Sequence, residues 1–411
     1  MTTWITCQLG AREHYSVPRA LSQTDQLYTL ITDAWVDPRS PFHYLPGTVV
    51  KNLCDRYHCD LSTASVRSFT QAGILFDVGK KLSNVTGWSR IISRNQWFQR
   101  RALRQLKFIE AQLLPSQCPV LFSYSYTALS LFQYAKSKGW QTILGQIDPG
   151  LSEEKRVEKL QASHGRQYAS TWTAAPTHYW QYWKQECQLA DRIVVNSPWS
   201  QTALTAIGVP KEKVKIVPLA YQSPAEAKDF IRQYPAKFTQ ARPLRVLFLG
   251  QVILRKGIAA LLEALPLLQK ESIEIWLVGS TAELDFPDWV RSHPKLHWIG
   301  PIPRSEVQHY YQQADVFLFP THSDGFGLTQ LEAQAWSLPI IASRYCGEVV
   351  QHQHNGLLLP DVSSQSIAYA LITCCQSPKA LRQWSQQSLD MGAYSLTQLA
   401  NTLQSIAHDI I

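Results

Sequence analysis

Short apolar segments that end at or near a glycine alternate with helical patterns along the C-terminal half of the chain. The strand candidates are 244–249, 273–278, 296–299, 315–319 and 339–342, with helical patterns over 257–270, 304–314 and 328–336 between them. Apolar strands that alternate with helices predict a doubly wound parallel sheet, an α/β fold. Because ligands of such sheets bind beyond the carboxyl ends of the strands, we expect functional residues in the loops that follow the strands.

The N-terminal half repeats this pattern less regularly. Its strand candidates are 4–8, 120–124, 141–146, 192–196 and 214–218. Ser197, followed by Pro198, is a typical start of a helix after the fourth of these strands. The chain has 411 residues, which is too long for one ordinary domain. We predict a first domain over 1–222, a linker over 223–243, a second domain over 244–393, and a C-terminal helix over 394–411 that packs back on the first domain.

Two carboxylates and two glycines mark the loop after the strand candidate 315–319. Asp324 and Glu332 are eight residues apart, and Gly325 and Gly327 flank the start of a helix. The free N–H groups and the dipole at a helix start attract phosphate. One carboxylate would then bind sugar hydroxyls and the other ribose hydroxyls. A capped helix start with one buried Glu is the structural alternative.

A second constellation follows the first strand of the same domain. The loop from Gly250 to Gly257 places Arg255 and Lys256 on the ligand side of the predicted sheet. Basic side chains at this place can neutralise a leaving diphosphate, although two solvated surface charges are the alternative. The chain contains neither the G-x-x-x-x-G-K-[ST] nor the G-x-G-x-x-G pattern, which disfavours P-loop and dinucleotide sites.

Together these motifs resemble those of the family 4 (group 1) retaining glycosyltransferases, in which two Rossmann-like domains of the GT-B fold face each other across a cleft. The segment from Asp324 to Glu332 is similar to the E-x7-E motif of this family. The resemblance covers the C-terminal half, and includes the 255–257 loop and residues 333–343 and 355–358. The N-terminal half is similar more loosely, through residues 190–197 and 214–218.

The resemblance implies a hexosyltransferase-like enzyme that transfers a sugar from a UDP-, GDP- or ADP-linked donor, with retention and without a metal ion or other cofactor. It implies that Lys256 and Arg255 contact the diphosphate, that Asp324 contacts the donor sugar, and that Glu332 contacts the ribose. The other donor-binding residues that it implies are Gly250, Gln251, Gly279, Pro301, Gly325, Phe326 and Gly327. The acceptor would be a saccharide or a lipid-linked saccharide, in the biosynthesis of a polysaccharide or a glycolipid.

The sequence departs from the family pattern at three positions. The motif begins with Asp324 rather than Glu, and Gln251 replaces an expected Arg. The expected His of the first domain is missing, which leaves Gln146 and Asp148 as candidates for its place. In the loop after the first strand, Arg12 and His14 are further cleft candidates, and an exposed loop without a ligand is the alternative. A non-catalytic sugar-nucleotide-binding or partner subunit is therefore the second hypothesis.

The net charge of +8 indicates an anionic partner, and the basic residues concentrate between residues 80 and 107. The cations of this stretch are Lys80, Lys81, Arg90, Arg94, Arg100, Arg101, Arg104 and Lys107. Large apolar residues lie between them, a pattern that predicts peripheral contact with an anionic membrane. A solvated helix face is the alternative. No nucleic-acid-binding motif accompanies the stretch, so we expect no nucleic acid partner.

No apolar run approaches the ~20 residues of a membrane-spanning helix, and the N-terminus has the pattern of a strand rather than of a signal peptide. We therefore expect the protein in the cytoplasm, in peripheral contact with the inner face of the membrane. The eight cysteines are scattered without metal-like spacing, and no metal site is predicted.

Overall fold

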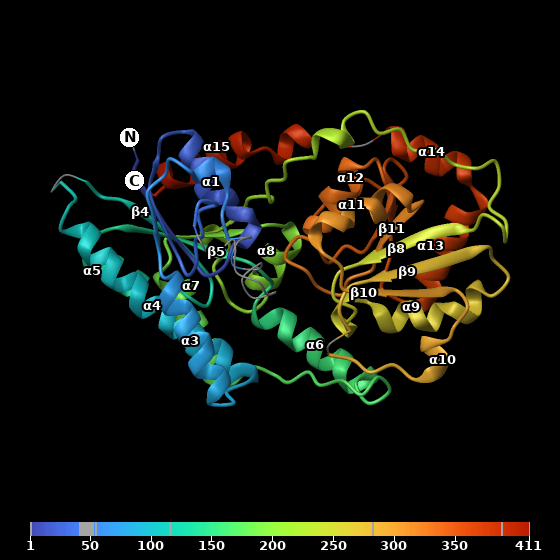
Figure 1. Cartoon of the computed structure of the whole chain (residues 1–411), viewed down its shortest axis with the longest axis horizontal. Helices are drawn as coiled ribbons and strands as arrows, with labels where there is room; N and C mark the ends of the chain where they lie inside the picture. Colours follow the sequence, from blue (N-terminus) through green and yellow to red (C-terminus); the bar gives the residue numbers. More distant parts are fainter. Residues whose placement is uncertain are drawn as a thin grey trace.

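The computed structural model describes residues 2–40, 53, 56–114, 117–281, 283–387 and 389–410. The chain forms two lobes, each built on one parallel sheet (Figure 1). In Figure 1 the first lobe lies on the left, in blue to green, and the second on the right, in yellow to orange. The predicted α/β fold class is thereby confirmed.

The first sheet has seven strands, all parallel, in the order β3-β2-β1-β4-β5-β6-β7. The strands are β1 (Trp4–Gln8), β2 (Leu27–Thr32), β3 (Val66–Ser68), β4 (Val120–Tyr124), β5 (Gln141–Gln146), β6 (Arg192–Val195) and β7 (Val214–Ile216). The chain first adds strands on one side of β1 and then continues on the other side from β4. The order therefore reverses between β1 and β4, where the loops after the two strands diverge.

The second sheet has six parallel strands in the order β10-β9-β8-β11-β12-β13. The strands are β8 (Leu244–Leu249), β9 (Ile273–Val278), β10 (Leu296–Gly300), β11 (Val316–Phe319), β12 (Ile340–Ala342) and β13 (Gly356–Leu358). Its order reverses between β8 and β11. Both sheets thus have the doubly wound topology that places a ligand crevice at the reversal point.

Helices cover both faces of each sheet. The helices of the first lobe are α1 (Ser16–Gln23), α3 (Thr70–Leu82), α4 (Gly87–Glu110), α5 (Leu129–Ser137), α6 (Leu151–His164), α7 (Thr177–Leu189) and α8 (Pro198–Thr205). The helices that come after β8 in the chain are α9 (Ile258–Ala264), α10 (Asp288–Arg291), α11 (Arg304–Gln313), α12 (Leu328–Ala335), α13 (Ser364–Gln376), α14 (Pro378–Gln386) and α15 (Leu396–His408). In the second lobe, α9 and α13 share a core on one face of the sheet, and α11 and α12 pack on the other.

The last helix returns to the first lobe. Leu399 and Leu403 of α15 pack with Trp4 and Leu21 in one apolar cluster, next to the start of the chain (Figure 1). The chain therefore crosses between the lobes twice in the described part. The two crossings lie side by side, because the N–H of Tyr221 donates to the carbonyl of Tyr394 at 2.8 Å.

The sequence pattern identified ten of the strands and missed β2, β3 and β13. β2 begins with half-buried residues and lacks a terminal glycine, and β3 and β13 have three residues each. Segments this short carry too few positions for a period to be visible. The N-cap prediction for Ser197 is confirmed, since its side chain accepts a hydrogen bond from the N–H of Ser200 at 3.1 Å.

A buried arginine from the segment between the sheets fixes two helices that reach the crevice of the second lobe. Arg232 is 8% exposed. It donates hydrogen bonds to the carbonyl oxygens of Tyr311, Gln312, Ala314, Trp336 and Ser337. These carbonyls lie at the C-terminal ends of α11 and α12, where helix carbonyls lack intrahelical partners and attract a positive charge. Arg232 therefore stabilises both helix ends at once.

We expect Arg232→Met to lower the free energy of unfolding by about 3 kcal/mol or more, because it leaves several buried carbonyls without a donor. Arg232→Lys should lower it less, since the charge remains but one ammonium cannot reach five oxygens. Urea denaturation of the variants and the wild type measures the difference. Arg344→Met, at an exposed position of the same lobe, is the control. Equal stabilities of Arg232→Met and Arg344→Met would contradict the role of Arg232.

Candidate active site

The two loops that follow β8 and β11 meet at the reversal point of the second sheet. A Cβ atom added to Gly257 would lie 2.0 Å from the carbonyl oxygen of Pro320, and Gly257 has φ +84°. Glycine is therefore required where the loop that carries Lys256 passes the loop that carries Asp324. This close approach brings the two constellations predicted from the sequence into one site.

Lys256 and Asp324 form a half-buried ion pair between these loops. Burial alone would raise the pKa of Asp324, but the charges of Lys256 and Arg255 outweigh it and hold that pKa below its usual value. Arg255 donates to the carbonyl of Ser323 at 2.8 Å, and its guanidinium lies 3.5 Å from the carboxylate of Glu153 in the first lobe. Two fixed cations thus lie at the carboxyl ends of β8 and β11.

Glu332 lies on the wall of a cavity of about 1160 Å³ between the lobes. Its carboxylate accepts a hydrogen bond from the hydroxyl of Tyr311 at 2.8 Å, which orients it from the neighbouring helix α11. Burial raises the pKa of Glu332, partly opposed by Tyr311 and Arg304. The cavity also contacts Leu249, at the end of β8, and Ile302, just beyond β10. Its size and mixed lining suit a nucleoside rather than a single sugar.

The loop after β1 forms the opposite wall of this cavity. Glu13, His14 and Tyr15 are three successive non-glycine residues with φ of +51°, +52° and +60°. Such left-handed residues cost energy, and strain of this kind concentrates at functional sites. Arg304 of the second lobe donates to Nδ1 of His14 at 2.6 Å, and burial lowers the pKa of His14 to about 4. A neutral His14 therefore joins the two walls.

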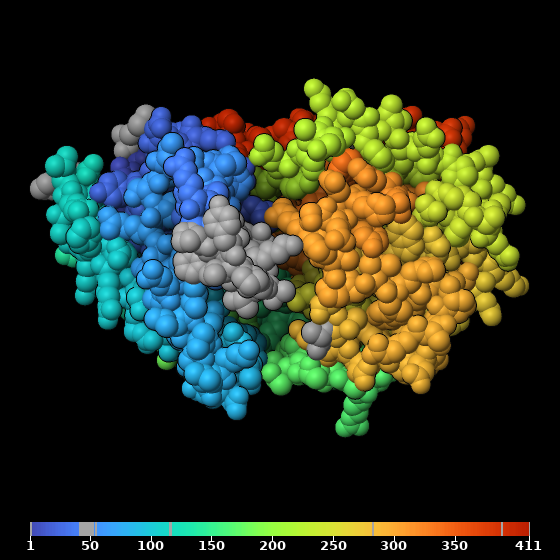
Figure 2. Space-filling view, in the orientation of Figure 1, coloured from blue at the N-terminus to red at the C-terminus, as the bar shows by residue number. Residues whose placement is uncertain are grey.

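The lobes touch closely at the Asp324 loop. A Cβ on Gly325 would lie 2.2 Å from the carbonyl oxygen of Ile147, at the end of β5. The hydroxyl of Ser200 donates to the carbonyl of Gly325 at 3.2 Å, and the indole of Trp199 donates to the hydroxyl of Ser323 at 3.2 Å. The space-filling view shows the lobes in contact, the first in blue and cyan and the second in orange (Figure 2).

Asp148 lies at this junction on the first lobe, and the buried Gln146 donates a hydrogen bond to its carboxylate. The hydroxyl of Tyr126 donates to Oδ1 of Asp148 at 2.6 Å, and the amide of Gln146 donates to the same oxygen at 3.1 Å. Gln146 is 2% exposed and also accepts a hydrogen bond from the indole of Trp183 at 2.8 Å. Of the two candidates for the position of the missing His, Asp148 is therefore the one that a ligand can reach.

A second cavity, of about 190 Å³, opens beside Asp148 and Arg255. Aromatic side chains line it from four segments: Trp88 of α4, Tyr126 of the loop after β4, Trp172 of the loop before α7, and Tyr179 and Trp180 of α7. Burial raises the pKa of Glu153 in this cavity, and the charge of Arg255 partly opposes the rise. None of these aromatic residues belongs to a motif, and their positions in the sequence are 71 or more residues away from the 251–256 loop. The sequence analysis missed them for that reason.

The other predicted donor residues lie at several separate places in the second lobe. Gly250 and Gly279 lie side by side at the ends of β8 and β9, with the carbonyl of Gly250 under Gly279. Gln251 is exposed and contacts the second cavity. Gly327 starts α12 with φ +84°.

Two of the predicted donor residues lie away from the described cavities. Phe326 is 3% exposed and packs near Tyr394, so its ring belongs to the core rather than to a ligand surface. Pro301 is exposed outside both cavities, and its neighbour Ile302 contacts the larger one instead. Arg12 is half-buried in the loop of His14.

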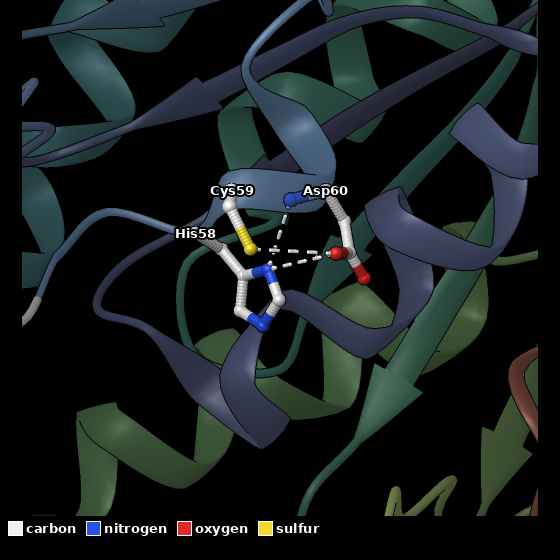
Figure 3. Close-up of side chains that lie close together, drawn as sticks. All are labelled: His58, Cys59 and Asp60. Atoms are coloured by element: carbon white, nitrogen blue, oxygen red, sulfur yellow. Dashed lines mark hydrogen bonds and ion pairs between the residues drawn. The ribbon is translucent and has the colours of Figure 1, made fainter.

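One cluster of metal-type ligands occurs among the described residues, at His58, Cys59 and Asp60 (Figure 3). Nδ1 of His58 already accepts the backbone N–H of Asp60 at 3.2 Å, and Arg19 pairs with the Asp60 carboxylate at 2.7 Å. A short helix start and an ion pair account for this arrangement. The expectation that the reaction proceeds without a metal ion stays a prediction.

The basic helix α4, which carries most of the cations of the stretch 80–107, is partly neutralised by acids from outside that stretch. Arg94 pairs with Asp33 at 3.0 Å and with Asp77 at 3.3 Å, and Arg90 lies 3.6 Å from Asp77. Trp97 and Phe98 are buried against the first sheet. Asp33 and Asp77 lie outside residues 80–107, so the composition of that stretch does not reveal these ion pairs. Within the described residues, no helix combines the length and the apolar character that a membrane span requires.

Residues 243–377 match the family model for glycosyl transferases of group 1. The amylovoran biosynthesis glycosyltransferase AmsK of Erwinia amylovora is 25% identical over 198 residues, which cover 43% of this chain and 45% of AmsK. The D-inositol 3-phosphate glycosyltransferase of Thermobifida fusca is 34% identical over 157 residues, which cover 33% of this chain and 35% of that protein. The chain thus spans less than half the length of these relatives.

A solved structure covers the whole chain. The Anabaena protein HepE in complex with UDP aligns over 99% of this chain and 100% of its own, with a TM-score of 0.59 and 14% identity. At this identity the likeness establishes the arrangement of the two lobes and not the activity. Residues 243–377 are therefore similar to the group 1 glycosyltransferases, and the two lobes together have the GT-B fold.

Proposed function

We propose that this protein transfers a sugar from a nucleotide-sugar donor to a saccharide or lipid-linked acceptor, with retention at the anomeric carbon, in the biosynthesis of a polysaccharide or a glycolipid. The observation that carries the proposal is the meeting of Arg255, Lys256 and Asp324 at the reversal point of the second sheet. Cations fixed there stabilise the charge that develops on a departing diphosphate. AmsK is named for amylovoran biosynthesis, which supports the polysaccharide assignment.

The donor extends from the large cavity to the junction of the lobes. Glu332 accepts the ribose hydroxyls, and Leu249 and Ile302 contact the base. Lys256 exchanges part of its contact with Asp324 for the diphosphate, which frees Asp324 to accept hydroxyls of the sugar. HepE binds UDP and UDP-glucose, which favours a uridine donor. The acceptor approaches through the aromatic cavity beside Asp148, because aromatic faces and carboxylates suit a sugar.

A thermal-shift screen against UDP-, GDP- and ADP-sugars tests donor binding, because a ligand stabilises the fold that it binds. Release of the nucleoside diphosphate from the stabilising donor tests catalysis. Stabilisation without release of the diphosphate or transfer of the sugar would favour the alternative, a non-catalytic subunit that binds a sugar nucleotide.

We expect Lys256→Ala to lower kcat about 10²- to 10³-fold, the usual cost of removing one fixed charge-stabilising group. The loss should appear in kcat more than in KM, because the contact strengthens as the leaving group departs. Steady-state kinetics with saturating donor measure the effect. Lys270→Ala, an exposed lysine in the same lobe, is the control. Unchanged kcat in a folded Lys256→Ala protein would remove Lys256 from the mechanism.

Glu332→Gln should weaken binding of the free nucleoside diphosphate and of the intact donor alike, because the ribose is common to both. Asp324→Asn should weaken binding of the intact donor and discrimination among donor sugars, and should spare the diphosphate more. Calorimetry with both ligands measures the four affinities. If both variants lose equal affinity for both ligands, the two carboxylates do not divide the donor in this way.

We also propose peripheral contact with an anionic membrane, through the tips of α3 and α4. Leu75, Val78 and Leu82 of α3 are 73%, 51% and 81% exposed. Lys81 and Arg90 are exposed beside these residues in the sequence. Exposed apolar side chains together with cations suit an anionic lipid surface. The helix α3 projects from the lower edge of the first lobe in Figure 1, where a planar surface can reach it.

The triple replacement of Leu75, Val78 and Leu82 by Gln should reduce co-sedimentation with vesicles that contain anionic lipid, and leave thermal stabilisation by the donor unchanged. Salt should weaken binding of the wild type, because the charges are screened. Ile231→Gln and Leu267→Gln, at exposed apolar positions elsewhere, are the controls. If the wild type sediments with neither neutral nor anionic vesicles, the patch has no role at a membrane.

A further inference from the structure

A third cavity, of about 240 Å³, lies on the first lobe between α4, α5 and α7. It adjoins the aromatic cavity described above, and its lining includes none of Arg255, Lys256, Asp324 and Glu332. The helix α4 contributes Ile92, Asn95 and Gln99, and α7 contributes Tyr182 and Glu186. The spacings of three, four and seven residues place each set on one helix face, so the two faces form the sides of a groove.

The groove presents polar groups that the fold does not use. Asn95 is half-buried and Gln96 and Gln133 are exposed; within the described part of the chain their side-chain amides make no hydrogen bond to another residue, and all three line the cavity. Glu186 differs, because its carboxylate already accepts the N–H groups of Tyr126, Ala128 and Leu129. Free amides beside an exposed tyrosine, Tyr182, are suited to hydroxyl groups and to the flat face of a sugar ring.

The groove continues directly from the aromatic cavity. Tyr126 and Tyr179 line both cavities and stack on each other, with ring centroids 4.9 Å apart. Trp88 lies at the end nearer to Asp148, with its ring 5.0 Å from that of Tyr179. From Trp88 to Gln99, α4 advances by about 16 Å at ~1.5 Å per residue. The path from Asp148 is therefore longer than one sugar.

We propose that this groove, between α4 and α7, binds the sugar units of an oligosaccharide acceptor that precede the unit being extended. The inference rests on the proposed function, because the reacting unit occupies the aromatic cavity beside Asp148. The recognised chemistry is a chain of hydroxyl-rich rings: amides and the guanidinium of Arg100 bind the hydroxyls, and Tyr182 packs on a ring face. A single sugar would leave the groove empty, so affinity should grow with chain length.

The probe is a printed array of bacterial oligosaccharides of one to six units, incubated with the wild type and with variants in the presence of UDP. We expect wild-type retention to rise with chain length within the glycan series that it prefers. Tyr182→Ala, and separately Asn95→Ala combined with Gln133→Ala, should reduce retention of the longer glycans about tenfold and leave that of the shortest unchanged. Tyr369→Ala, an exposed helical tyrosine of the second lobe, is the matched control.

The inference is overturned if the wild type retains no glycan, if retention does not depend on chain length, or if the variants match the wild type. Thermal stabilisation by UDP and release of the diphosphate from a donor are measured on the same proteins. These two readouts depend on the second lobe and should be unchanged in Tyr182→Ala. If they are absent from the wild type, the proposed function fails, whereas a failure of the array alone leaves that function standing.

Discussion

The half-buried ion pair of Lys256 and Asp324 is the interaction around which the second lobe and the site are arranged. It joins the loops that follow β8 and β11 at the one edge of the sheet where their directions diverge. Each charge is partly removed from water at this place, so the ion pair favours the arrangement in which the two loops stay together. The same loop then presses Gly325 against Ile147, which carries the arrangement to the first lobe.

Basic side chains stabilise the second lobe at two separate places. Arg255 and Lys256 face the crevice, whereas Arg232 holds the far ends of α11 and α12. The N-terminal ends of helices attract anions, and a cation at the C-terminal ends stabilises the same dipoles. The position of Glu332 within α12 thus depends on a residue from the segment between the sheets, which no motif of the lobe contains.

The sequence predicted the fold well because buried parallel strands read as apolar runs with a glycine at the end. It also predicted that Arg255, Lys256, Asp324 and Glu332 of the candidate site follow strands of one sheet, and in the structure they follow β8 and β11. The aromatic cavity was not predictable in this way. Trp88, Trp172 and Tyr179 come from three segments that the fold brings together, and isolated aromatic residues have the same pattern in a core. The ion pairs with Asp33 and Asp77 were not predictable for a similar reason, since both acids lie outside the basic stretch that they neutralise.

The return of α15 to the first lobe has a consequence for synthesis of the chain. Trp4 and Leu21 emerge early from the ribosome, but their partners Leu399 and Leu403 emerge almost four hundred residues later. Domains usually fold as units in the order in which they are made. Here the first lobe must wait, with part of its apolar surface uncovered, until the second lobe has been translated. The second lobe, although made later, takes the strands of its sheet and the helices α9 to α14 from one continuous stretch, residues 244–386.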